Sequence, residues 1–156
     1  FKMKNLIFNW RPEGLPEDWE LLLAADPSQR IIATYLEKSA FLEARREGEL
    51  VGLLLLATTS SAEHGEIVNL SVRPSEQNQG IGSQLLQQAL AYGKRLGYRR
   101  MEVATATTSF GPLYLYQKNG FRVTSVEQDY YLKCYDEVLR ENGLVVKDRL
   151  ILTQSL

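Results

Sequence analysis

Residues 72–86 read VRPSEQNQGIGSQLL, a polar loop with two spaced glycines that leads into a strongly apolar segment. Apolar residues then recur at helical spacing, basic residues occupy the last turn and Gly97 follows, so we predict a helix over residues 81–96. Successive backbone N–H groups before a helix, together with the positive end of its dipole, suit a pyrophosphate. Two glycines alone are equally consistent with a tight turn.

Two common phosphate-binding motifs do not match this loop. A Walker loop requires a lysine after its last glycine, followed by serine or threonine, whereas Ile81 follows Gly80 here. A dinucleotide-binding fingerprint requires a third glycine where Leu85 stands, within a series of parallel strand–helix–strand units. The remaining interpretation is a pyrophosphate site that is neither a Walker loop nor a dinucleotide-binding loop.

The elements on either side of the loop predict the fold class. We expect a strand at residues 6–9, helices at 17–25 and 28–38, three strands in an antiparallel meander within 41–72, a strand at 99–106, a helix at 109–119, a strand at 121–128, a short helix near 136–140 and a last strand at 148–154. This order predicts a mixed α/β (α+β) domain over residues 1–156, with a largely antiparallel sheet and helices on its faces.

Composition excludes several classes of partner. The 18 basic and 19 acidic residues leave a formal charge of −1, so we expect no nucleic-acid partner. One cysteine, Cys134, and one histidine, His64, cannot form a disulfide or a zinc site, so we expect no metal. The apolar run at residues 50–58 is too short to cross a bilayer, and residues 1–13 do not resemble a signal peptide, so we expect a cytoplasmic protein without a membrane partner.

Two motifs in this sequence resemble the GNAT superfamily of N-acetyltransferases. Residues 77–82, QNQGIG, match the signature Gln/Arg-x-x-Gly-x-Gly/Ala, and residues 115–121, LYQKNGF, match Leu-Tyr-x-x-x-Gly-Phe in the same order as in the family. The resemblance covers about residues 50–126. It implies a twisted mixed sheet of about seven strands with helices on both faces. It also implies transfer of an acetyl group from acetyl-CoA to a primary amine.

The resemblance also implies where acetyl-CoA binds. The pyrophosphate is expected at the backbone amides of Gln77, Asn78, Gln79, Gly80, Ile81, Gly82 and Ser83. The pantetheine arm is expected to pair with the strand before the loop, at Leu70, Ser71 and Val72, where that strand splays from its parallel neighbour.

One segment departs from the family pattern. Phe110 and Leu113 stand where many members have asparagine and alanine. The hydroxyl of Thr107, with those of Thr108 and Ser109, is a substitute for binding the cofactor arm, and helix capping is the alternative role.

The same resemblance assigns the chemistry. Tyr116 matches the tyrosine that protonates the departing thiolate, and an aromatic packing role is its alternative. Glu66, in a Glu-Ile-Val run, matches the general base of the histone acetyltransferases, directly or through a water; an exposed strand glutamate is the alternative. The N–H of Leu70 is the expected oxyanion donor, and Asn69 points to the opposite face of its strand.

The acceptor is left open by the sequence. A small-molecule amine and a peptide amino group fit equally, and a homodimer is not excluded. The acidic and aromatic residues within 129–137 would attract a cationic amine or form an interface, and Trp10 and Trp19 are candidates for lining the acceptor pocket or for the core. A non-catalytic acyl-CoA-binding sensor or regulatory module is the alternative to an enzyme.

Overall fold

The computed structural model describes residues 5–156. Its seven-stranded sheet has the order β1-β2-β3-β4-β5-β9-β6, and all neighbouring strands are antiparallel except β4 and β5. The strands are β1 (Leu6–Arg11), β2 (Ser39–Arg46), β3 (Glu49–Thr58), β4 (His64–Val72), β5 (Arg100–Ala106), β6 (Arg122–Glu127) and β9 (Arg149–Ser155). This mixed, mostly antiparallel sheet confirms the predicted fold class.

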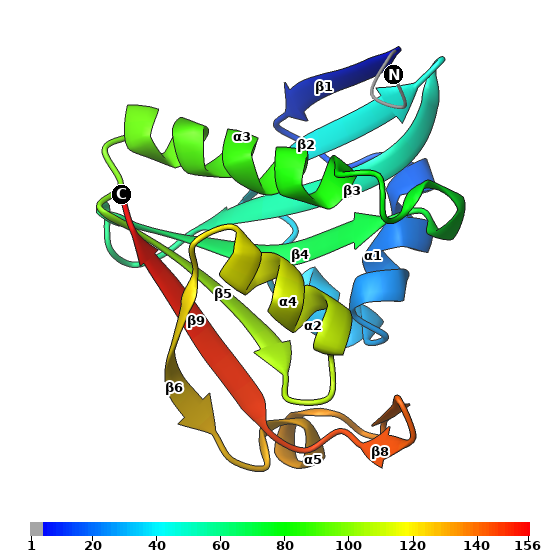
Figure 1. The fold of residues 1–156 in the computed structure, drawn as a ribbon, viewed down its shortest axis with the longest axis vertical. Helices are drawn as coiled ribbons and strands as arrows, with labels where there is room; N and C mark the ends of the chain where they lie inside the picture. Colours follow the sequence, from blue (N-terminus) through cyan, green and yellow to red (C-terminus); the bar gives the residue numbers. More distant parts are fainter. Residues whose placement is uncertain (1–4) are drawn as a thin grey trace.

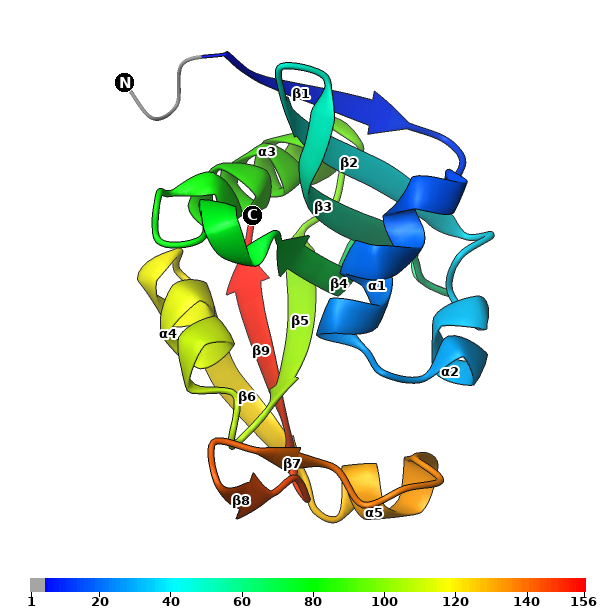
Figure 2. The same ribbon diagram turned by 90° about the vertical axis from the view of Figure 1, so that its right-hand side faces the viewer.

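Helices cover both faces of the sheet, as predicted (Figures 1 and 2). One face carries α3 (Ile81–Arg95) and α4 (Phe110–Lys118), and the other carries α1 (Trp19–Ala25) and α2 (Gln29–Ala33). Two short 3-10 helices, η1 (Pro16–Asp18) and η2 (Pro74–Glu76), precede α1 and α3. At the end of the sheet where β5 stops lie α5 (Tyr130–Cys134) and the hairpin of β7 (Arg140–Glu141) and β8 (Leu144–Val145) (Figure 2).

Strand β3 is the centre of two apolar cores. Leu54 and Leu56 belong to the cluster beneath α3, while Leu53 and Leu55 belong to the cluster beneath α1 and α2. Alternate side chains of a strand point to opposite faces, so a strand covered on both sides is apolar throughout. This explains the uninterrupted apolar run that the sequence shows there.

Two predicted helices differ from the structure. Helix α2 ends at Ala33 instead of continuing to residue 38. The helix predicted near residues 136–140 is wrong, because the helix of this segment is α5 and residues 140–141 pair with 144–145. Asn142 and Gly143 connect β7 and β8 with φ of 52° and 78°. An Asn-Gly pair with two positive φ values favours a tight hairpin.

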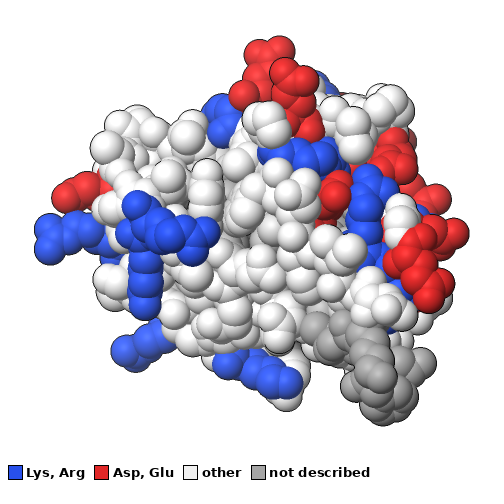
Figure 3. Space-filling view, turned by 90° about the horizontal axis from the view of Figure 1, so that it is seen from above, with Lys and Arg blue, Asp and Glu red and all other residues white. Residues whose placement is uncertain are grey.

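The surface carries charges of both signs. On the face seen in Figure 3, basic side chains prevail at the left and lower edges, acidic and basic side chains lie next to one another at the right, and most of the centre is uncharged. Within residues 5–156, no helix is long and apolar enough to cross a membrane. The same residues contain no group of three or more histidine, cysteine, aspartate or glutamate side chains placed to hold a metal ion.

Candidate functional site

Strands β4 and β5 are paired over only part of their length. Their parallel pairing covers residues 64–67 of β4 and ends at the pair Ile67 and Val103, whereas β4 continues to Val72. At the same point the pairing of β4 with β3 shifts, since Leu56 faces Ile67 and Leu55 faces Asn69. The resulting bulge bends β4 away. Residues 68–72 therefore have no strand on their β5 side, and the predicted contacts at 70–72 border this opening.

The loop after β4 presents its backbone at the start of α3. Asn78 and Gly80 have positive φ values of 61° and 87°. The side-chain amide of Gln77 donates to the carbonyl of Val72 at 2.9 Å and holds the loop against the end of β4. The first N–H groups of a helix have no acceptor within it. Within residues 5–156, no hydrogen bond takes up the N–H groups of residues 81–83.

The two glycines of the loop have different surroundings. A Cβ on Gly82 would lie 3.0 Å from Cδ2 of Leu115, so a side chain there would require Leu115 of α4 to shift. A Cβ on Gly80 would meet no atom within 4 Å, so the requirement at that position is the left-handed backbone. Beside them, Oε1 of Gln79 is buried without a hydrogen-bond partner in the described chain. The loop is thus an uncovered, donor-rich surface suited to an anion.

The two sequence motifs meet through Asn119. Its Nδ2 donates to Oγ of Ser83 at 3.1 Å and to the carbonyl of Leu115 at 2.9 Å. Its Oδ1 accepts from Nε2 of Gln87 at 2.9 Å. The hydrogen bonds of Asn119 to Ser83 and Gln87 therefore hold the end of α4 against the first turns of α3. The sequence predicts Asn119 only as the last residue of a helix over residues 109–119 and contains no local signal for this contact.

Tyr116 lies in the core on the α3 side of the sheet. Its side chain is 6% exposed and contacts the ring of Phe121 edge-on, with 6.2 Å between the ring centroids. Its hydroxyl forms no hydrogen bond with residues 5–156. Burial raises the pKa of Tyr116 to about 12. The phenol is therefore protonated at neutral pH and has a proton to donate.

Glu66 lies on the opposite face of the sheet. Gly65 and Ile67 face the α3 side, so Glu66 points toward the side of α1 and α2. Burial and the negative charge of Glu102 raise the pKa of Glu66, and the positive charge of Arg149 opposes them. A carboxylate with a raised pKa is a better proton acceptor near neutral pH.

Asn69 faces α1, opposite to Leu70, as strand alternation predicts. It is 5% exposed, and its Nδ2 donates to the carbonyl of Leu22 at 3.2 Å and to the hydroxyl of Tyr35 at 3.1 Å. The Tyr35 hydroxyl donates to Oδ2 of Asp26 at 3.2 Å, and the Tyr135 hydroxyl donates to Oδ1 of Asp26 at 2.8 Å. This series of hydrogen bonds, from Asn69 through Tyr35 and Asp26 to Tyr135, joins β4 to the segment after α5. The sequence contains no local signal for it.

The tyrosines noted in the sequence gather beside this chain. Tyr131 lies between Tyr130 and Tyr135, with centroid distances of 5.0 and 5.5 Å. The guanidinium of Arg149 lies 3.8 Å from the centroid of Tyr130 and pairs with Glu127 at 2.5 Å. These side chains form an aromatic wall, defined here as Tyr130, Tyr131 and Tyr135, facing the connection between α1 and α2.

The hydroxyls before α4 bind the β7–β8 hairpin. Thr108 and Ser109 are buried and donate to Oε1 of Glu141 at 3.1 and 2.6 Å. Ser109 does not cap α4 with its side chain. Thr107 is exposed, and its N–H donates to the carbonyl of Asp148 at 3.2 Å. Of these three hydroxyls, that of Thr107 has no protein partner among the described residues.

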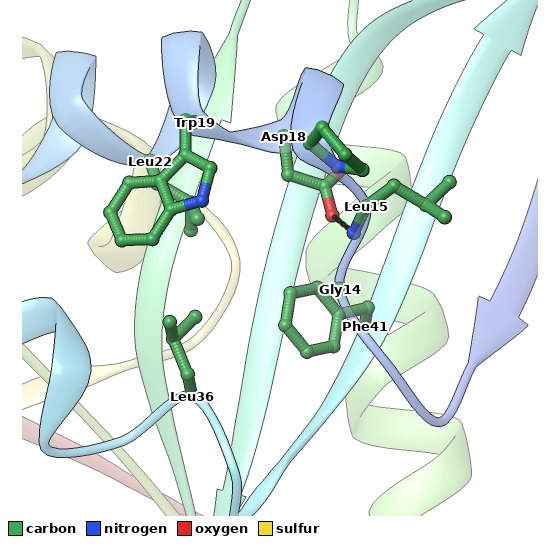
Figure 4. A pocket seen from close by; sticks show the side chains of 8 residues that line it. Gly14, Leu15, Asp18, Trp19, Leu22, Leu36 and Phe41 are labelled. Atoms are coloured by element: carbon green, nitrogen blue, oxygen red, sulfur yellow. Dashed lines mark hydrogen bonds between the residues drawn. The ribbon is translucent and has the colours of Figure 1, made fainter.

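The two tryptophans occupy opposite faces of the sheet. Trp10 stacks on Tyr92 of α3 with 4.3 Å between the ring centroids, so it packs against the α3 core. Trp19 lines a pocket of about 360 Å³ between α1 and β2 (Figure 4). There the Asp18 carboxylate accepts from the N–H of Leu15 at 2.7 Å and pairs with Arg11 at 2.7 Å. The lining includes none of the predicted cofactor or catalytic residues.

Comparison with known proteins adds to this geometry. The model of the acetyltransferase (GNAT) family matches residues 4–121. The uncharacterized N-acetyltransferase YvbK of Bacillus subtilis is 38% identical over 154 residues, which cover 99% of both chains. A GNAT family acetyltransferase from Elizabethkingia anophelis, solved with acetyl-CoA bound, is 36% identical with a TM-score of 0.92, over 98% of this chain and 99% of that one. The IAA acetyltransferase from Bacillus cereus is 38% identical with a TM-score of 0.90, over 97% and 99%.

Proposed function

The chain belongs to the acetyltransferase (GNAT) family, and from this premise we propose that it transfers the acetyl group of acetyl-CoA to a primary amine by direct attack on the thioester. One observation carries the proposal: the opening between β4 and β5 leads directly to the uncovered amides at the start of α3. The similar Elizabethkingia structure, which holds acetyl-CoA, supports the same donor here. Residues 1–156 would act as one cytoplasmic domain, with no metal required.

The loop would bind the donor through its backbone. The amides of residues 77–83 would hold the pyrophosphate, with Ser83 adding its hydroxyl, because their N–H groups and the α3 dipole favour an anion. The backbone of Leu70, Ser71 and Val72 would pair with the pantetheine arm as an additional strand. Thr107 would supply a hydroxyl on the far side of the opening.

Two groups would act on the thioester. Acetyl-CoA supplies an activated acyl carbon and a thiolate leaving group. The N–H of Leu70 would donate to the acyl oxygen as negative charge develops on it. The Tyr116 hydroxyl would give its proton to the departing sulfur, and its buried position keeps that proton in place beforehand.

Glu66 would accept the proton that the amine loses, directly or through a water. A primary amine with an ordinary pKa of about 10 is mostly protonated at neutral pH and cannot attack in that form. The raised pKa of Glu66 supports this role, since it strengthens the base.

The acceptor would approach from the face that carries Glu66. The aromatic wall borders this face, and aromatic rings attract cationic amines.

A panel of amines tests the proposal. Purified protein is incubated with acetyl-CoA and polyamines, amino sugars, amino acids or short peptides, and free thiol is measured together with the acetylated product. Turnover with at least one amine in wild type, reduced in Tyr116→Phe, supports the enzyme. Saturable acetyl-CoA binding without turnover on any amine favours the non-catalytic acyl-CoA-binding module instead.

A further inference from the structure

Glu66 and Glu102 form a pair of neighbouring carboxylates on two parallel strands. They are directly opposite each other in the register of β4 and β5, one pair before the strands separate. Side chains opposite each other in a sheet point to the same face, and adjacent strands are about 4.8 Å apart. Both residues are half-buried. None of the ion pairs or hydrogen bonds within residues 5–156 uses either carboxylate.

The charges around this pair come from three other segments and from β4 and β5 themselves. Arg149 on β9 and Lys38 before β2 are the cations that act on Glu66, and Glu127 at the end of β6 adds a further negative charge. Arg149 is already paired with Glu127 at 2.5 Å. Two residue pairs further from the opening, His64 faces Arg100 on the same side of the sheet. Among the described residues, neither Arg149 nor Lys38 forms an ion pair with Glu66 or Glu102, and Arg149 is paired with Glu127.

We propose that Glu102 is a positioning residue for Glu66: the carboxylate opposite Glu66 on the adjacent strand accepts a hydrogen bond from Glu66 once Glu66 has taken the proton of the acceptor amine. This inference rests on the proposed function, in which Glu66 is the base. Burial and the negative charge of the neighbouring Glu102 both raise the pKa of Glu66, because each disfavours its ionised form.

The pairing has a simple consequence for the proton transfer. When the amine attacks, its N–H bond breaks and the proton moves to an oxygen of Glu66. The new O–H lies beside the ionised Glu102, which can accept a hydrogen bond from it and stabilise the protonated form. Deprotonation to solvent then restores the starting state, with no other reactant.

The test measures titration and activity separately. The carboxyl carbon of Glu66 is followed by ¹³C NMR across pH in wild type and in Glu102→Gln, with Glu102→Asp as a variant that keeps the charge. The control is Glu63→Gln, which removes one negative charge from an exposed ion pair with Arg99. We expect the Glu66 midpoint to move to lower pH in Glu102→Gln, to stay close to wild type in Glu102→Asp and to be unchanged in the control.

The pH profile of kcat/KM completes the test. In Glu102→Gln the acidic limb is expected to follow the NMR midpoint to lower pH, giving a severalfold smaller loss of activity on acidification than in wild type. If the NMR titration midpoint of Glu66 is unchanged in Glu102→Gln, the proposed role of Glu102 is overturned. It is also overturned if the midpoint moves but the acidic limb of the kcat/KM profile does not. An unchanged profile in Glu66→Gln is a distinguishable result, since it removes Glu66 as the base and thereby overturns the proposed role of Glu102 as well.

Discussion

Ile67 and Val103 are the last paired residues of β4 and β5, and past this pair β4 continues to Val72 paired only with β3. The bulge beside Ile67 bends β4 where the pairing stops. Pairing and separation thus occur within one strand. The part of β4 that is paired with β5 carries Glu66, and the part that is separated from β5 leads to the loop before α3.

Gly80→Ala should weaken acetyl-CoA binding and also lower stability. The left-handed φ of 87° costs an alanine about 1–2 kcal/mol, although its Cβ meets no atom within 4 Å. The matched control is Gly48→Ala, which has φ of 84°, equally open surroundings and a position in the β2–β3 turn. Chemical denaturation should show similar losses for both variants, and calorimetry should show weaker binding for Gly80→Ala alone. Equal affinities would contradict the assignment of the loop.

Tyr116→Phe should lower kcat by about 10²-fold with little change in acetyl-CoA affinity, a magnitude typical of a lost general acid. The hydroxyl has no protein partner in the described chain, so its removal should leave the free energy of unfolding nearly unchanged at neutral pH. Steady-state kinetics and calorimetry on the same preparation check both statements. Wild-type turnover in the variant would exclude the acid role.

Asn69→Ala should destabilise the protein by about 1–3 kcal/mol, because it removes the buried donor to Leu22 and Tyr35. Tyr135→Phe removes only the partly exposed end of the same chain, its hydrogen bond to Asp26, and should cost less. Urea unfolding of the two variants and of wild type gives the comparison. A larger loss of unfolding free energy in Tyr135→Phe than in Asn69→Ala would contradict the view that Asn69 contributes most to this series of hydrogen bonds.

Stability should fall in alkaline solution because of buried tyrosines. Burial raises the pKa of Tyr116 to about 12 and also raises the pKa values of Tyr35, Tyr131 and Tyr135. Below pH about 10, the ordinary tyrosine pKa, both states keep their protons and stability is complete. Above it the unfolded state ionises first, so stability decreases toward the folded pKa.

Tyr116→Phe isolates one contribution to this decrease. The buried phenol should account for a loss on the order of 2 kcal/mol by pH 12. Urea unfolding of wild type and variant between pH 8 and 11 should therefore give stabilities that are similar at pH 8 and diverge as pH rises, with wild type losing more. Parallel curves would mean that Tyr116 does not keep its proton in the folded state.

Local patterns were enough to predict the centre of the fold. The apolar spacing after Gly80 predicts α3, which spans Ile81–Arg95, and the long apolar run predicts β3. The family resemblance adds the mixed sheet with helices on both faces. These features depend on neighbours within a few turns or one strand, so the sequence carries them directly.

Features that depend on distant contacts were missed. The helix predicted near residues 136–140 followed composition, while the Asn142–Gly143 turn and pairing with residues 144–145 determine the actual structure. The hydrogen bond from Tyr135 to Asp26 joins residues 109 apart in sequence. Thr108 and Ser109 likewise bind Glu141 through contacts more than 30 residues distant. No periodicity encodes such pairs.

The thermal unfolding midpoint against acetyl-CoA concentration tests the central claim most directly, because it requires no knowledge of the acceptor. Free ligand at 100 times its dissociation constant should stabilise the protein by about 2.7 kcal/mol, a shift that is easily measured for a chain of 156 residues. We predict a saturable rise in wild type and a rise at higher concentrations in Gly80→Ala. No shift in wild type up to millimolar acetyl-CoA would contradict acetyl-CoA binding at this loop, and with it the proposed transfer reaction.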